Sequence, residues 1–166
     1  MRGFSLLETL VAIAILTLAV LGPLTVASFV LFSATLAENE AAAFNLAEEG
    51  MELVINKRDS NIFSGQNWLN GLDASGGCHT ANGCYVDALT VVFNGCSANC
   101  PKLRRDASTG LYNYDAADPE TLFERRIYLE NVAGTSDEKK IRVVLTWQER
   151  LVTHSFTLER HIFLKL

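Results

Sequence analysis

The chain has 166 residues, enough for one domain with a buried core beside an N-terminal segment, and nothing in this length argues for two globular domains. Its formal net charge is -5, from 14 Lys and Arg against 19 Asp and Glu. Because proteins hold nucleic-acid phosphates with clustered Lys and Arg, this balance argues against direct nucleic-acid binding.

The first predicted element is an uncharged, mostly apolar run, Thr9–Ala37. It is long enough to cross a bilayer, which needs about 20 apolar residues. Arg2 and the free amine precede the run, and no basic residue follows it until Lys57. The positive-inside tendency therefore places the N-terminus in the cytoplasm and the bulk of the chain outside. A cleavable secretory signal, the competing interpretation, has a shorter apolar region than this one.

Two residues in the middle of this span are unusual for a helix interior. Gly22 and Pro23 follow one another there. Because proline lacks a backbone donor and clashes with the preceding turn, the pair predicts a helix kink or a local melt.

The helical period continues beyond the span and becomes amphipathic over residues 38–60. Its predicted apolar stripe is formed by Phe44, Ala47, Met51 and Val54, with Leu46, Gly50 and Leu53 beside them. Lys57 and Arg58 suit the C-terminal turn, where cations complement the helix dipole, and Asp59-Ser60-Asn61 predicts the end of the helix.

A loop rich in Gly, Asn and Ser over residues 65–83 precedes a series of strand-like runs. The predicted strands are Tyr85–Phe93, Leu111–Tyr114, Leu122–Val132, Lys140–Glu149 and Val152–Leu166. Apolar and more polar residues alternate in the fourth, and turn signals separate the last three, which indicates an antiparallel meander. The predicted class is α+β, with a long N-terminal α-helix packed on an antiparallel β-sheet.

The four cysteines have the spacing C-x5-C-x11-C-x3-C: Cys78, Cys84, Cys96 and Cys100. On the exported side of a membrane, disulfides persist, whereas a zinc site usually uses tighter two-residue knuckles that are absent from this spacing. Of three connectivities, Cys78 with Cys84 and Cys96 with Cys100 is favoured because each pair closes a small loop, although spacing alone does not decide.

Catalysis and metal binding find little support in the sequence. His79, His154 and His161 have no nucleophile motif nearby, and the carboxylates form no recognisable acid-base pair. Residues 106–110 and 115–120 collect oxygens that could hold calcium, but turn chemistry explains them as well. The basic pairs Arg125-Arg126 and Lys139-Lys140 are expected to be solvated. No catalytic residue, metal ligand or cofactor is predicted, with calcium as a minor alternative.

Gly3-Phe4-Ser5-Leu6-Leu7-Glu8 closely resembles the processing motif of type IV prepilins and pseudopilins. The resemblance implies a pilin-like fold, cleavage between Gly3 and Phe4 by a membrane aspartyl peptidase, and N-methylation of Phe4. It also implies that Glu8 pairs with the terminal amine of an adjacent subunit during assembly. The alternative for Glu8 is a place in the headgroup layer, where it suits the helix dipole.

A second resemblance is to the helix exit of minor pilins of the PilV and pseudopilin-I kind, through residues 46–54 and 58–61. The two resemblances imply a leader peptide, 1–3; a transmembrane and filament-core helix, 4–37; an amphipathic half of the same helix, 38–60; and an exported globular β domain, 61–166. The chain ends in a predicted strand where a major pilin often has a Cys-bounded loop, which favours a minor pilin or a pseudopilin.

The expected function is therefore that of a structural filament subunit, a minor type IV pilin, and not that of an enzyme. Its implied partners are a prepilin peptidase and methyltransferase, other pilin subunits and an inner-membrane assembly platform. It would begin as a single-pass protein of the cytoplasmic membrane and end in a cell-surface or periplasmic filament. The alternatives are a pseudopilin of a type II secretion or DNA-uptake system and, from another class, a single-pass signal-anchored exported binding domain.

Overall fold

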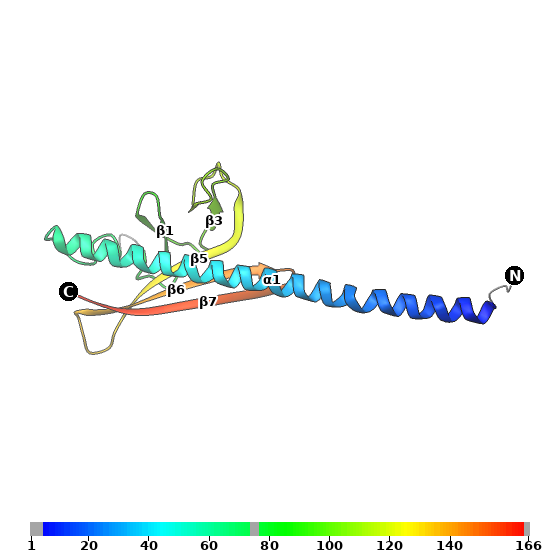
Figure 1. Ribbon diagram of the computed structural model, residues 1–166. Helices are drawn as coiled ribbons and strands as arrows, with labels where there is room; N and C mark the ends of the chain where they lie inside the picture. Colours follow the sequence, from blue (N-terminus) through cyan, green and yellow to red (C-terminus); the bar gives the residue numbers. More distant parts are fainter. Residues whose placement is uncertain (1–4, 74–76, 165–166) are drawn as a thin grey trace. The chain divides into compact units, whose positions relative to one another are not determined.

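The computed structural model describes residues 5–73 and 77–164 (Figure 1). Its elements are, in chain order, α1 (Leu6–Phe63), β1 (Cys84–Asp87), β2 (Val92–Gly95), β3 (Lys102–Arg105), β4 (Tyr112–Asn113), β5 (Glu120–Asn131), β6 (Glu138–Glu149) and β7 (Val152–Phe163). Two compact units divide the chain, Met1–Ala41 and Ala42–Leu166, and α1 contributes to both. The predicted α+β class is confirmed.

The described part of the first unit is the first half of α1. Serine and threonine side chains there bond to carbonyls one turn earlier: Thr17 Oγ1 donates to Ala14 O at 2.9 Å, and Thr25 Oγ1 donates to Gly22 O at 2.8 Å. These hydroxyls are therefore satisfied within the helix, which suits an apolar surrounding. Helix also continues through Gly22 and Pro23, so a local melt is not seen there, and the kink itself stays a prediction.

The second unit is built on one antiparallel sheet in which β5 is the hub. Its long partner is β6, which pairs in turn with β7, so the last three strands form the predicted meander. Along its other edge β5 pairs with β1 near Ile127 and with β3 near Glu120 and Glu124. The short strands β2 and β4 extend the sheet beyond β1 and β3.

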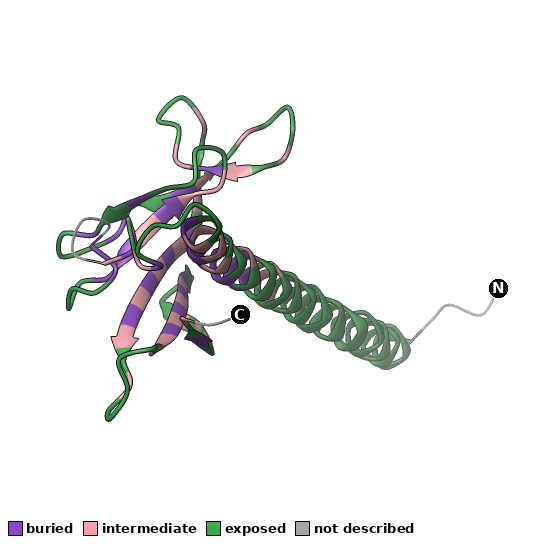
Figure 2. Cartoon of the chain, turned by 90° about the vertical axis from the view of Figure 1, so that its left-hand side faces the viewer, coloured by how far each residue is buried: buried purple, intermediate pink, exposed green. Residues whose placement is uncertain are grey.

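The core lies between this sheet and the second half of α1. The buried helix residues recur at three- and four-residue steps: Ala43, Leu46, Ala47, Gly50, Met51, Val54, Arg58 and Asn61. Facing them are the buried residues of β5 and β6, which alternate with partly exposed ones along each strand (Figure 2): Phe123, Arg125, Ile127, Leu129, Ile141, Val143, Leu145 and Trp147. The predicted stripe is confirmed except that Phe44, at its edge, is 42% exposed.

The short strands differ from the prediction. Tyr85–Phe93 is not one strand but a hairpin, because Asp87 turns the chain: its Oδ1 accepts from the Leu89 N–H at 2.9 Å and its carbonyl from the Val91 N–H at 2.8 Å. In place of the predicted strand Leu111–Tyr114, β4 covers two residues, and β3, where only Leu103 is buried, was not predicted. The final strand ends at Phe163, and Lys165 and Leu166 lie outside the described residues.

Two expectations about basic residues are wrong. Arg125 is 1% exposed rather than solvated, because it lies in the inward-facing phase of β5. Arg58 does not lie in the last turn of α1, which continues to Phe63; it is buried and donates to the Phe163 carbonyl at 3.1 Å.

Candidate functional site

The first turn of α1 is stabilised by its own side chains. Ser5 precedes the helix, and its Oγ accepts from the Glu8 backbone N–H at 3.3 Å, while the Ser5 carbonyl accepts from the N–H groups of Glu8 and Thr9 at 3.0 and 3.2 Å. Ser5 is therefore an N-cap, and Glu8 stands three residues later, the spacing of a capping box. This role of Ser5 was not predicted, although the Ser-x-x-Glu signal is present in the sequence.

Glu8 is exposed, and its negative charge in the first turn complements the positive end of the helix dipole. Within residues 5–73 and 77–164, its carboxylate takes part in no ion pair. Gly3 and Phe4 lie outside the described residues, so the cleavage and methylation of this end of the chain stay predictions.

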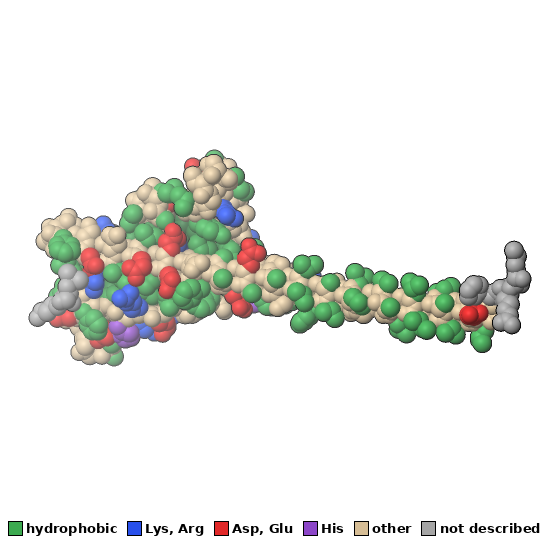
Figure 3. Space-filling view, viewed as in Figure 1, with side chains coloured by type: hydrophobic (Ala, Val, Ile, Leu, Met, Phe, Trp, Pro, Cys, Tyr) green, Lys and Arg blue, Asp and Glu red, His purple; other side chains and the backbone are tan. Residues whose placement is uncertain are grey.

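Beyond Glu8 the helix exposes its apolar side chains on all sides. Every residue from Ser5 to Thr35 is exposed, and Figure 3 shows apolar side chains along this whole part of the helix. None of the most apolar stretch is buried within the protein, and α1 is the one helix of the described chain that is long and apolar enough to cross a membrane. Such a surface needs lipid or other apolar helices around it.

Three arginines tie the second half of α1 to the sheet. Arg125 on β5 donates to Glu49 Oε2 at 2.6 Å, and also to the carbonyls of Leu46 at 3.1 Å and Val86 at 2.8 Å. Arg160 on β7 pairs with Glu52 at 3.2 Å, and Arg58 holds the end of β7. The helix is thus joined to β5 and β7 by directional bonds in addition to apolar packing.

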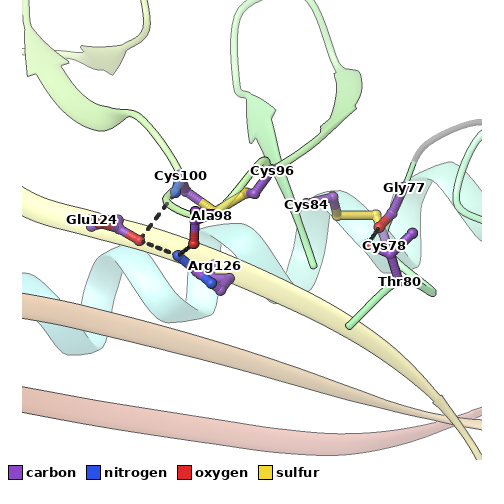
Figure 4. The surroundings of a disulfide bond; sticks show 9 residues. All are labelled: Gly77, Cys78, Thr80, Cys84, Cys96, Ala98, Cys100, Glu124 and Arg126. Carbon is purple, nitrogen blue, oxygen red and sulfur yellow. Dashed lines mark hydrogen bonds and ion pairs between the residues drawn. A yellow bond between two sulfur atoms is a disulfide. The ribbon is translucent and has the colours of Figure 1, made fainter. Parts of the chain in front are cut away.

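Both predicted disulfides are present: Cys78–Cys84 and Cys96–Cys100, with Cα–Cα distances of 4.5 and 4.8 Å (Figure 4). All four cysteines are therefore in disulfides. The first bridged loop joins β5 through the Leu129 N–H, which donates to the Cys78 carbonyl at 2.8 Å. The second lies against β5 through the Cys100 N–H, which donates to Glu124 Oε1 at 3.3 Å.

The oxygen-rich segments that could hold calcium are arranged as turns. Asp106 accepts from the hydroxyls of Ser108 and Thr109 at 2.7 Å each, and these hydrogen bonds hold the pKa of its carboxyl well below its usual range. Asp118 accepts from Asn113 Nδ2 at 2.7 Å, and Glu120 pairs with Arg104. Among the described residues no group of three His, Cys, Asp or Glu converges on a metal position.

The three histidines lie apart from one another and have separate partners. The His79 ring is 2.7 Å from the Leu129 carbonyl, His154 stacks on Trp147 with 5.4 Å between ring centroids, and His161 contacts Glu138 at 2.6 Å. Each imidazole ring thus has a contact within the sheet domain that accounts for its position.

Comparison with known proteins adds one finding at the head of the chain. The family model of the prokaryotic N-terminal methylation motif matches residues 1–22. No curated protein and no solved structure matches the chain. The match covers the residues of the predicted leader, Glu8 and the first part of the apolar helix.

Proposed function

We propose that the chain is a minor pilin of a type IV pilus-like filament, a proposal that the prokaryotic N-terminal methylation motif at residues 1–22 supports. A prepilin peptidase cuts it between Gly3 and Phe4, and Phe4 is then N-methylated. The apolar part of α1 first holds the subunit in the inner membrane, with the N-terminus in the cytoplasm, and later packs among other subunits in the filament core.

The observation that carries this proposal is the exposure of α1. The most apolar stretch of this helix is 0% buried within its own chain, so its side chains need apolar contacts with other molecules. Lipid supplies them before assembly and neighbouring helices supply them afterwards, so the same surface serves both states. A sheet domain joined to the same helix, as found here, is what a filament displays on its surface.

Glu8 sets the axial position of one subunit relative to the next during assembly. A carboxylate at membrane depth costs about 3 kcal/mol on insertion scales, and an amine close by offsets that cost. Cleavage before Phe4 creates such an amine, and an adjacent subunit brings its own. Pairing in low dielectric then favours the one stagger that brings Glu8 and an amine together.

The arginine contacts fit a subunit that is pulled by its helix. Arg125, Arg160 and Arg58 hold the second half of α1 to the sheet, so extraction of the helix from the membrane carries the folded domain with it. A pseudopilin of a secretion or DNA-uptake system would use the same architecture. Recovery of the protein in filaments sheared from the cell surface favours the pilin, and periplasmic retention favours the pseudopilin.

The test compares two substitutions of Glu8 that separate its charge from its place in the capping box. Glu8→Gln removes the charge but keeps an N3 side chain able to accept a hydrogen bond from the cap residue's N–H, whereas Glu8→Ala removes both the charge and that capacity. We expect both variants to insert into the membrane as the wild type does and both to be depleted from sheared filaments. Quantitative immunoblotting of membrane and sheared fractions measures this.

Ser5→Ala is the matched control, because it removes the cap without touching the charge. Its filament incorporation should stay close to that of the wild type. If Glu8→Gln assembles normally and only Glu8→Ala fails, Glu8 acts through helix capping and not through a charge pair. Normal incorporation of both Glu8 variants contradicts the assembly role altogether.

A further inference from the structure

We propose that β7 and the second half of α1 form a docking site for an extended segment of another protein. The segment adds to the open edge of β7 as an antiparallel strand and places apolar and basic side chains in the groove between β7 and α1. Every residue of this site lies in the second unit. The inference goes beyond the proposed function, because it assigns a partner to the sheet domain and not to the apolar helix.

Strand β7 leaves one of its two sides without a partner strand. It pairs with β6 over all twelve residues without a break in register, and with no other strand of the described sheet (Figure 1). The strands at the other ends of the sheet, β2 and β4, have four and two residues. A long unpaired strand is a template for another strand, and proteins usually block such an edge with Lys, Pro or a bulge. None of these is present in β7.

The backbone groups that face the open edge can be identified from the register. In an antiparallel pair, residues that bond the neighbouring strand alternate with residues that do not. The Leu164 N–H donates to the Asp137 carbonyl at 2.8 Å, which continues the β6–β7 register, so the even-numbered residues of β7 bond β6. The Phe163 carbonyl fits this phase, because it accepts from Arg58 and not from β6. The edge open to a new strand is thus formed by Thr153, Ser155, Thr157, Glu159 and His161.

A groove of about 370 Å³ lies beside this edge. It is lined by residues of α1 and β7: Glu48, Met51, Glu52, Leu158, Glu159 and Arg160. Because consecutive residues of a strand point to opposite faces, lining by three consecutive residues of β7 means that the groove opens at the edge of the sheet. Side chains of an added strand that face α1 therefore enter the groove. There they meet an apolar surface, formed by Met51 and by Leu158, which packs against the core.

The charge of the groove is negative. Glu52 pairs with Arg160 at 3.2 Å, and Glu159 pairs with Lys140 at 3.3 Å. Glu48 is exposed and takes part in no ion pair within residues 5–73 and 77–164. A Lys or Arg of the partner can pair with Glu48, whereas a carboxylate there is repelled. The partner that fits is an extended segment that directs an apolar residue into the groove, with Lys or Arg two positions away.

The first test measures binding of synthetic peptides to the full chain in detergent. In the peptide TKTVTKT, the valine and both lysines share one face of a strand. The control peptide KTTVTTK has the same composition, but its lysines lie on the face opposite the valine. We expect TKTVTKT to bind several-fold more tightly, as measured by the fluorescence anisotropy of labelled peptides. Equal affinities overturn the proposed fit to the groove.

Two N-methylated forms of TKTVTKT test whether the peptide pairs with the backbone of β7. In antiparallel addition, the peptide residues that bond β7 are those that point away from the groove. Methylation of the threonine amide that follows the valine therefore weakens binding several-fold, whereas methylation of the valine amide leaves it unchanged. Equal binding of the two methylated peptides overturns strand addition, and this test does not alter the protein.

Variants of the protein test the same contacts from its side. Thr157→Pro removes one outward N–H and keeps the bonds to β6, and Thr157→Ala is the matched control that keeps this N–H. We expect only Thr157→Pro to lose binding several-fold, with the fluorescence of the buried Trp68 and Trp147 as the check of folding. Glu48→Gln should weaken binding of TKTVTKT but not of a peptide with norleucine in place of lysine. Equal effects on both peptides overturn the role of Glu48.

Sedimentation of the protein without peptide tests a second copy as the alternative occupant of the edge. We expect the wild type and Thr157→Pro to sediment alike. A concentration-dependent dimer of the wild type that Thr157→Pro dissociates would assign the edge to a second copy and overturn the proposed partner.

Discussion

Arg125 shows how a single residue joins the helix to the sheet. Its side chain is 1% exposed, a position that is costly for a charge unless polar partners replace water. Glu49 and two carbonyls provide them, and Gly50 leaves the space: a Cβ there would lie 3.0 Å from Arg125 Cδ and 3.4 Å from Val143 Cγ1. Glycine in this helix thus makes room for the arginine.

We expect Arg125→Met to lower the free energy of unfolding by about 3 kcal/mol, toward the lower end of values for broken buried pairs, because Glu49 is partly exposed and can be hydrated again. The Val86 carbonyl loses the donor that Arg125 supplies. Urea titration of the full chain in detergent, followed by the fluorescence of Trp68 and Trp147, measures the change, since both are buried in the sheet domain.

Arg126→Met is the control at the next position, on the opposite face of β5. Arg126 pairs with Glu124 at 2.8 Å near the surface, where ion pairs contribute at most about 1 kcal/mol. Equal effects of the two substitutions would contradict the role given to Arg125.

The buried position of Arg125 could have been predicted from the phase of its strand. Phe123, Ile127 and Leu129 alternate toward the core, and Arg125 falls in the same phase. The adjacent Arg126 favours the opposite expectation, because two neighbouring basic residues usually indicate a solvated pair. The contact with Glu49 could not have been predicted, because it depends on which helical turn faces β5.

Among the elements, the long ones agree with the prediction, whereas β1, β2 and β4 have other bounds than predicted and β3 was not predicted. The amphipathic half of α1 and β5 to β7 have enough residues for the period of their buried positions to be unmistakable. In contrast, β3 and β4 are four and two residues long and bury one side chain each, so they follow from pairing with neighbours rather than from pattern. The end of α1 was missed because Arg58 and Asn61 are buried within it.

The two disulfide-bridged loops can be compared by the stability that each bridge contributes. Replacing both cysteines of either bridge with alanine should cost about 2 kcal/mol through the freedom restored to the unfolded chain. The Cys78 and Cys84 double substitution should cost more than the Cys96 and Cys100 one, because its sulfurs belong to residues 1% and 0% exposed and leave a cavity in the core.

The urea titration described for Arg125 measures both double variants. Equal losses would mean that the cavity term is negligible and that the bridges act through the unfolded chain alone. A larger loss for the Cys96 and Cys100 variant would contradict the assignment of the first bridge to the core, since those residues are 9% and 5% exposed.

At the scale of the whole molecule, the two units differ in whether their apolar side chains are buried. The second unit buries its apolar residues in its own core, while the first leaves an apolar helix fully exposed, which suits a protein anchored in the inner membrane. Under the proposed function, the sheet domain is already folded in the single subunit, and the exposed helix needs contact with lipid or with other subunits.

The N-terminus of the mature protein tests this interpretation most directly. We predict that intact-mass and N-terminal peptide mass spectrometry of the membrane-extracted protein finds a chain that begins with methylated Phe4, having lost Met1 to Gly3. An intact Met1, or a chain that begins beyond the apolar run, contradicts processing as a pilin and leaves the exposed helix as a simple membrane anchor.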